Sequence, residues 1–226
     1  MDNPSNPDIE NRLPLTITSI SVQKKRKDRF SLFHEKEFLI GVSAQTLTDY
    51  NIRKGTVLTH DLFLKILHSE DYQKIKDAIY RYLSGRDHAS FELKQKVMKK
   101  GFDAALIDSV LEEFDQKELL NDEVFAKKFA VDKSEFKRWG PVKIKQALYK
   151  KGISKPIAEK VVQNLSKNLA QDQICVDLLR KRKAHFSREE DPLKRKQKMY
   201  RYLAGKGYHG KSISKAIDSI SNEFDA

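Results

Sequence analysis

A glycine-rich segment near the carboxyl end has the residue types of a phosphate-binding loop. Residues 205–212 read Gly-Lys-Gly-Tyr-His-Gly-Lys-Ser, which fits the pattern G-x-x-x-x-G-K-[ST]. In nucleotide-binding proteins such a loop follows a strand and opens a helix inside a parallel sheet. Here helical periodicity precedes the loop, and only residues 213–226 follow it. We therefore expect no nucleotide site, although amides at a helix start in residues 210–212 would suit a nucleic-acid phosphate.

Other reactive side chains are not arranged for catalysis or for metal binding. The six histidines do not pair with one another or with a cysteine at ligand spacing, so we expect no metal and no cofactor. The single Cys175 excludes an internal disulfide and fits a reducing cytoplasm. It lies between Ile174 and Val176 on a predicted helix, which favours a buried structural thiol. The sequence thus predicts a protein that is not an enzyme.

Positive charge is the strongest functional signal in the chain. The net charge is +12, and residues 133–160 carry nine Lys or Arg side chains against two acids. Residues 178–211 carry twelve against three, whereas residues 103–123 carry one lysine against eight acids. A single charged run is usually a solvated helix face, but two large basic blocks favour a polyanionic partner.

The candidate binding residues come from these two blocks. Most are cations placed off the expected apolar stripes, where they can face a partner. Trp139 could stack on a base or anchor a protein interface, and packing between helical units is an equal alternative. The candidates are Arg138, Trp139, Lys143, Lys145, Lys150, Lys151, Arg180, Lys181, Arg182, Lys183, Lys194, Arg195, Lys196 and Lys211.

The elements that position these residues begin with a β region. Alternating apolar residues between residues 13 and 42, interrupted by polar turns at 24–29 and at Glu35-Lys36, predict a three-stranded meander. Ser43 or Thr46 can cap a short helix, and residues 61–67 form another short helical piece. We expect a disordered tail over residues 1–12 and a β-meander domain over residues 13–68.

From residue 71 onward the period is helical, and a repeat organises the chain. Gly101, Gly152 and Gly207 recur at spacings of 51 and 55 residues, each after a predicted helix. Apolar residues stand eight and four positions before each glycine and ten and thirteen positions after it. Glycine at such a place fits the residue after a helix end, where φ is positive.

Three tandem three-helix repeats follow from this pattern, over residues 69–119, 120–168 and 169–226. Asn121 can cap one helix, and Pro141 and Pro192 suit first helical turns. We expect a mostly α protein with an elongated, curved body and one long surface. The predicted helices are 71–85, 90–100 and 103–116, then 122–137, 141–151 and 154–168, and then 170–186, 192–205 and 210–222.

The middle repeat resembles the RecX family of bacterial recombination regulators. The matching run is D-E-x-F-A…G-x-x-K-I-x-x-x-L-x-x-K-G-I-S, which here extends from Asp122 to Ser154. The junctions at Gly101 and Gly207 fit less tightly, and the β region resembles an extension found in some members. The resemblance covers residues 14–226, but the third repeat's basic block and the Trp139-Gly140 pair match no family role.

The resemblance implies a cytoplasmic, monomeric regulator of DNA repair, recombination and the SOS response. It would bind the RecA recombinase filament on single-stranded DNA and inhibit ATP hydrolysis, strand exchange and coprotease activity. Weak non-specific duplex DNA binding is also expected, with no membrane partner. An alternative is a helical regulator that reads a duplex DNA sequence. An ATP-using enzyme would rest on residues 205–212 alone.

Overall fold

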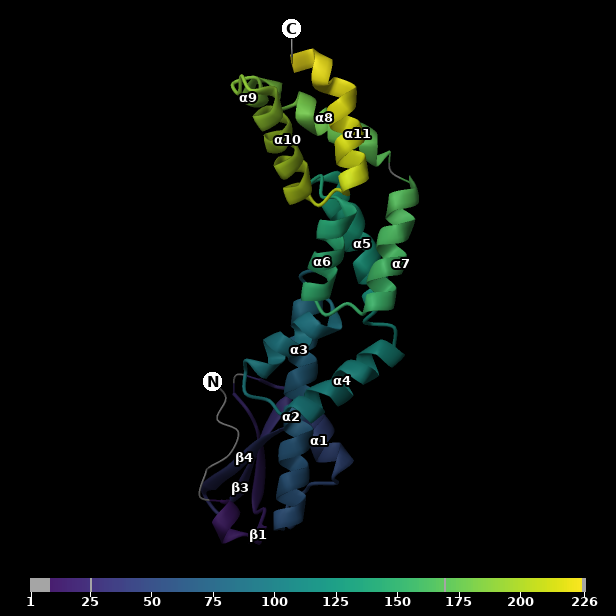
Figure 1. Cartoon of the computed structure of the whole chain (residues 1–226). Helices are drawn as coiled ribbons and strands as arrows, with labels where there is room; N and C mark the ends of the chain where they lie inside the picture. The colour runs from purple at the N-terminus through teal and green to yellow at the C-terminus, as the bar shows by residue number, and fades with distance from the viewer. Residues whose placement is uncertain (1–8, 25, 169, 225–226) are drawn as a thin grey trace. The chain divides into compact units, whose positions relative to one another are not determined.

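The computed structural model describes residues 9–24, 26–168 and 170–224. The chain forms two compact units, one of residues up to 82 together with 97–110, and one of residues 83–96 with 111 onward. Unit 1 carries the β region and unit 2 carries the middle and third helical groups (Figure 1). The mostly helical class with a small amino-terminal β region, predicted from the sequence, is confirmed.

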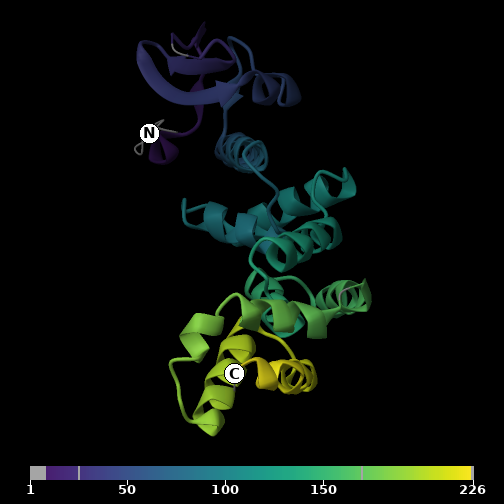
Figure 2. The same cartoon turned by 90° about the horizontal axis from the view of Figure 1, so that it is seen from above.

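The predicted meander is present in unit 1 as an antiparallel sheet. Its strands are β2 (Ser19–Val22), β3 (Arg29–His34) and β4 (Glu37–Ser43), in that order. Leu32 pairs with Ile40 across β3 and β4, and both side chains are fully buried. Figures 1 and 2 show this hairpin at the amino-terminal end of the chain.

A second, two-stranded sheet was not expected. It pairs β1 (Leu15–Thr16) with β5 (Val57–Leu58). Strands of two residues carry too little alternation to be recognised from a sequence. The disordered tail predicted over residues 1–12 is wrong for its last part, because Ile9 is fully buried and a 3-10 helix spans Glu10–Arg12. The remainder of that tail lies outside the described residues.

Two helices complete unit 1's β region. The helix α1 (Ala44–Asp49) begins as predicted at Ser43, whose hydroxyl accepts a hydrogen bond from the Thr46 amide at 3.1 Å. The helix α2 (His60–Leu83) is a single element. The prediction of separate helices over 61–67 and 71–85 is therefore wrong, and the domain boundary expected between 68 and 69 falls inside α2. The polar run at residues 68–71 suggested a break, but one of its members is buried.

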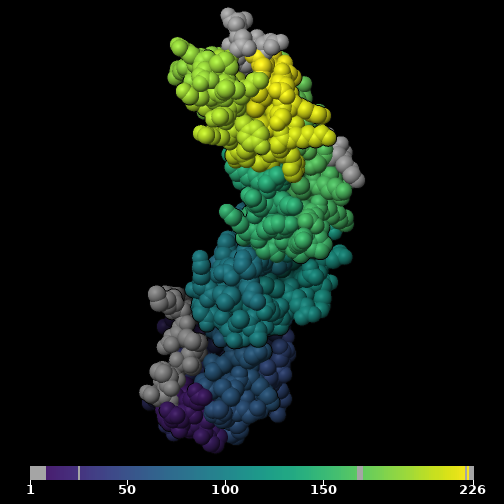
Figure 3. Space-filling view, in the orientation of Figure 1, coloured from purple at the N-terminus to yellow at the C-terminus, as the bar shows by residue number. Residues whose placement is uncertain are grey.

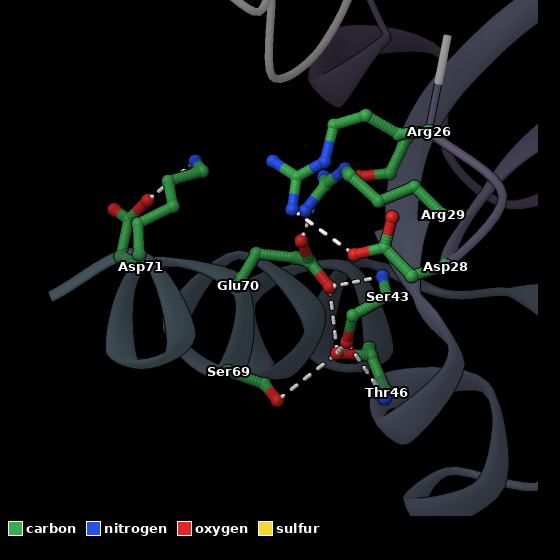
Figure 4. Close-up of polar contacts among 10 residues, drawn as sticks. Arg26, Asp28, Arg29, Ser43, Thr46, Ser69, Glu70 and Asp71 are labelled. Carbon is green, nitrogen blue, oxygen red and sulfur yellow. Dashed lines mark hydrogen bonds and ion pairs between the residues drawn. The ribbon is translucent and has the colours of Figure 1, made fainter. Parts of the chain in front are cut away.

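That buried residue, Glu70, joins α2 to the sheet (Figure 4). Its carboxylate lies 2.8 Å from the Arg29 guanidinium, and the two side chains are 2% and 9% exposed. The other carboxylate oxygen accepts hydrogen bonds from the Ser43 amide and the Thr46 hydroxyl, both at 2.7 Å. Arg29 also donates to the Gly41 carbonyl at 3.0 Å. Each charge is thus compensated inside the protein, which a buried ion pair requires.

The helical groups follow the predicted order, with one break. Asn121 caps α5 as predicted, and the two prolines open α6 and α10. The helix expected over 170–186 is wrong in one respect, since it stops at Arg180 and resumes at Lys183, which lets Phe186 reach the core. The helices are α3 (Ser90–Met98), α4 (Ala104–Gln116), α5 (Asp122–Glu135), α6 (Pro141–Lys150), α7 (Lys155–Asn168), α8 (Gln171–Arg180), α9 (Lys183–Phe186), α10 (Pro192–Lys206) and α11 (Gly210–Ile220).

The middle and third groups each have their own core. In the middle group, Ile144 and Leu148 of α6 pack with α5 and α7. In the third group, Met199 and Leu203 of α10 pack with α8 and α11. These are the positions eight and four before the repeat glycines, as the sequence predicted. Figure 3 shows the two groups, coloured green and yellow, in continuous contact.

The three repeat glycines have the positive φ angles that the sequence predicted, +87° at Gly101, +79° at Gly152 and +92° at Gly207. Two of them also contact a neighbouring group of unit 2. A Cβ at Gly152 would lie 2.2 Å from the Cβ of Phe91, and a Cβ at Gly207 would lie 2.5 Å from the Lys143 amide nitrogen. Nothing lies within 4 Å of a Cβ built at Gly101. The last two glycines are therefore needed for packing as well as for backbone conformation.

Replacing these glycines with alanine should separate the two effects. We expect Gly101→Ala to lower the unfolding free energy by about 1 kcal/mol, the cost of a left-handed residue. Gly207→Ala adds a clash with the α6 backbone and should cost about 3 kcal/mol. Urea denaturation of the two variants measures the difference. Equal losses would show that the contact at Gly207 is not tight.

Replacing Glu70 with alanine should leave Arg29 buried without a counter-charge. We expect the unfolding free energy to fall by about 3 kcal/mol. Asp28→Ala is the matched control, because Asp28 pairs with Arg26 on the surface, where its side chain is 66% exposed. The control should unfold at the wild-type urea midpoint. A Glu70→Ala variant as stable as the control would contradict the role given to the buried pair.

Candidate nucleic-acid and partner interface

The predicted binding cations fall into two classes in the structure, and the first class is already paired within the protein. Lys151 lies 2.8 Å from Glu92, and Arg180 forms a two-point contact with Glu223 at 2.6 and 3.1 Å. Lys145 and Lys194 have more distant acidic partners, Glu159 at 3.8 Å and Asp191 at 3.7 Å. These four side chains help to hold the fold, so they are less available to a partner.

Three further candidates are held by contacts other than ion pairs. Arg195 is only 8% exposed and donates to the Glu189 carbonyl at 3.3 Å. Arg182 lies over the Tyr202 ring, 4.9 Å from its centre. Lys143 lies 4.9 Å from the centre of the Trp139 ring and donates to the Gly205 carbonyl at 3.0 Å. Burial removes Arg195 from the surface, which helical periodicity did not indicate.

The second class of cations is exposed. Within the ranges 9–24, 26–168 and 170–224, no ion-pair partner is found for Arg138, Lys150, Lys181, Lys196 or Lys211. Lys183 is also exposed and opens the short helix α9. An unpaired surface cation loses no internal contact when it meets a phosphate or a carboxylate. The five unpaired side chains are therefore the best binding candidates, and we name them the free cations.

Trp139 takes the packing role among its two alternatives. The indole is half-buried against the core of the middle group, and Lys143 covers its ring. Its face is thus less open to a base than the sequence allowed. The adjacent Gly140 lies against the third group, where a Cβ would meet the Gly207 carbonyl oxygen at 2.3 Å. The Trp139-Gly140 pair, which matched no family role, thus forms part of the contact between the two groups.

Phe136 is a surface residue that sequence reasoning missed. Its side chain is 77% exposed, the highest value among the large hydrophobic residues that the structure describes. It stands seven residues after Phe129, which packs on the middle core, so periodicity places it on the same apolar stripe. The helix α5 stops at Glu135, however, and Phe136 turns outward. No sequence signal distinguishes this position from a core residue.

A small pocket in unit 2 brings candidates from both basic blocks together. Its volume is about 260 Å³, and Ile174 and Leu178 of α8 contribute its apolar lining. Arg138 comes from the loop before α6, whereas Arg180 and Lys181 come from the end of α8. The only acid that lines it is Asp177, which already accepts a hydrogen bond from Gln173 at 3.0 Å. Two free cations, Arg138 and Lys181, therefore share one concave site.

Residues 205–212 do not form a phosphate-binding loop. Gly205 and Lys206 are the last residues of α10, so a helix precedes the loop where that chemistry needs a strand. The Gly207 carbonyl accepts the Val142 amide at 3.0 Å, which uses the segment for packing. Ser212 hydrogen-bonds to Asp172 and lowers the pKa of that carboxyl. Lys211 is exposed in the first turn of α11.

Searches for metal and membrane elements were negative in the described part of the chain. No group of three or more His, Cys, Asp or Glu side chains is suitably placed to hold a metal ion there. No helix there combines the length and apolarity needed to cross a membrane. Cys175 is fully buried in the core of the third group, as predicted, and burial raises the pKa of its thiol to about 12.

Four family models match successive segments of the chain. They are described as the regulatory protein RecX N-terminal domain, at residues 15–59, and the first, second and third three-helix domains of RecX, at residues 76–114, 121–162 and 170–217. All four segments occur in chain order. They correspond to the β region and the three helical groups.

Curated relatives and solved structures agree with these matches. The regulatory protein RecX of Clostridium beijerinckii is 28% identical over 205 residues, which cover 90% of this chain and 95% of that protein. The one from Clostridioides difficile is 28% identical over 92% and 98% of the two chains. A crystal structure of regulatory protein RecX superposes with a TM-score of 0.74 at 20% identity, covering 90% of this chain and 98% of that one. RecX from Lactobacillus salivarius gives 0.61 at 24% identity, over 68% and 99%. The two structures support the fold.

The buried thiol yields a prediction for chemical labelling. Because the pKa of Cys175 is raised to about 12, the reactive thiolate is scarce at pH 8, and burial also blocks access. We expect no reaction with a disulfide reagent such as DTNB in the native protein and one thiol per chain in urea. Absorbance at 412 nm reports the reaction. Rapid labelling of the native protein would contradict the burial of this side chain.

Proposed function

The chain belongs to the RecX family, and we propose that it binds the RecA recombinase filament on single-stranded DNA and inhibits ATP hydrolysis, strand exchange and coprotease activity there. The observation that carries this proposal is the match of all four RecX segments in order along the chain. We further propose that the protein acts as a monomer in the cytoplasm.

The charge distribution supports a polyanionic partner for unit 2. The free cations are exposed on the middle and third groups and are not neutralised by acids in the described ranges. Each such side chain can contact a DNA phosphate or an acidic patch on a recombinase subunit. The acidic block at residues 103–123 would face basic protein surface instead. A regulator of this kind needs binding surfaces and no catalytic group.

The first test is RecA ATP hydrolysis on single-stranded DNA, with this protein titrated below the concentration of filament subunits. We expect strong inhibition at substoichiometric amounts, because one bound molecule would block a cooperative filament. No effect from protein shown to be folded by circular dichroism would overturn the proposal. Tight binding to one duplex sequence in the same preparation would then identify the duplex-reading alternative.

Matched variants test the role of the free cations in the same assay. Arg138, Lys150 and Lys181 are changed together to glutamine, and the control changes the paired Lys127, Lys145 and Lys194. Both variants lose three charges. The first should inhibit RecA about tenfold less well, and its salt dependence on single-stranded DNA should flatten by about 0.7 per lost phosphate contact. Equal losses in the two variants would mean that net charge alone matters.

A further inference from the structure

The loop from Phe136 to Trp139 has a fixed backbone with outward-facing side chains. The Trp139 amide donates to the Lys133 carbonyl at 3.0 Å. From the third group, Lys206 donates to the Lys137 carbonyl at 3.4 Å, and the Tyr208 hydroxyl donates to the Arg138 carbonyl at 3.3 Å. Contacts from two helical groups thus hold this loop, and a loop held in this way presents its side chains without an ordering cost on binding.

Backbone strain marks the same loop. Arg138 has φ +50°, a left-handed conformation that is unfavourable for a residue with a side chain. Such a residue costs on the order of 1–3 kcal/mol, persists only where its surroundings impose it, and is concentrated at functional sites. Here the hydrogen bond from Tyr208 to the Arg138 carbonyl is one of the contacts that impose it. The strained backbone places an exposed guanidinium two residues after an exposed phenyl ring.

The surroundings of the ring indicate the chemistry of its partner. A single exposed apolar side chain is common on a protein surface and needs no explanation by itself. Phe136, however, is followed by the exposed Lys137 and Arg138, and Arg138 rims the pocket with Lys181. An aromatic face beside cations suits a single-stranded nucleic acid, whose bases stack on the ring while its phosphates meet the cations. An apolar protein partner would leave these cations without counter-charges.

We propose that this surface is a single-strand DNA site, in which one base stacks on Phe136 and a neighbouring phosphate is held by Arg138 and Lys181 at the mouth of the pocket. This inference rests on the proposed function and specifies where the single strand contacts the protein. Arg180 contributes by position, because its contact with Glu223 fixes the end of α8 beside Lys181.

Alanine and tyrosine at position 136 test the stacking contact. We expect Phe136→Ala to bind a fluorescein-labelled thymidine oligomer about tenfold more weakly, since one base–aromatic stack contributes on the order of 1–3 kcal/mol. Phe136→Tyr, which keeps an aromatic face, should stay within about twofold of wild type by the same reasoning. Leu193→Ala is the matched control, because Leu193 is 73% exposed and should not affect affinity. Fluorescence anisotropy at fixed salt measures all four proteins.

The outcomes separate this inference from the proposed function. If wild type and Phe136→Ala bind the oligomer equally while RecA inhibition persists, the stacking site is wrong and the proposed function stands. If Phe136→Ala loses only RecA inhibition, the ring contacts protein, which also overturns the site. If the wild type does not bind single-stranded DNA, the DNA part of both proposals fails.

A spectroscopic readout detects stacking directly. Trp139 is the only tryptophan, so Phe136→Trp in a Trp139→Phe background places a single indole at position 136. We expect the thymidine oligomer to quench this fluorescence, because a stacked base removes the excited state. Inorganic polyphosphate, which has charge but no bases, should compete for the protein without quenching. Quenching by neither polymer, or equally by both, would overturn the stacking role.

Discussion

Gly140 and Gly207 meet without a side chain between them, and the third helical group depends on this contact for its place on the middle group. The Gly140 amide donates to the Lys206 carbonyl at 2.8 Å, and the Val142 amide donates to the Gly207 carbonyl. The start of α6 and the end of α10 thus satisfy each other's unpaired backbone groups. The two ends also carry opposite partial charges, which favours this arrangement. A side chain at either glycine would separate the ends.

The same contact organises the candidate interface. Lys206 and Tyr208 stand on either side of Gly207 and bind the carbonyls of Lys137 and Arg138. The packing of the two groups therefore fixes the loop that carries Phe136. The pocket beside Arg138 exists only because α8 of the third group is held against this loop. Binding surface and group contact are two faces of one short segment.

Local signals in the sequence predicted the elements that have local causes. The meander follows from alternation, the α5 start from Asn121, and the repeat helix ends from glycines with positive φ. Features set by distant contacts were not predicted. The helix α2 continues through Glu70 because Arg29 compensates its charge, and Arg195 is buried although its neighbours are exposed. Among the binding candidates, sequence supplied the basic blocks, but only tertiary contacts separate Lys181 from the paired Arg180.

The continuous helix α2 has a consequence for how such proteins change over evolution. Its first turns bury Phe63 and Ile66 in the core of the β region, and its later turns include Ile75 and Ile79, which are also buried. Loss of the β region would leave Phe63 and Ile66 without a core and Glu70 without its partner. Recombination between relatives can therefore exchange the β region only together with most of α2. The boundary that is free to vary lies after residue 83, where this helix ends.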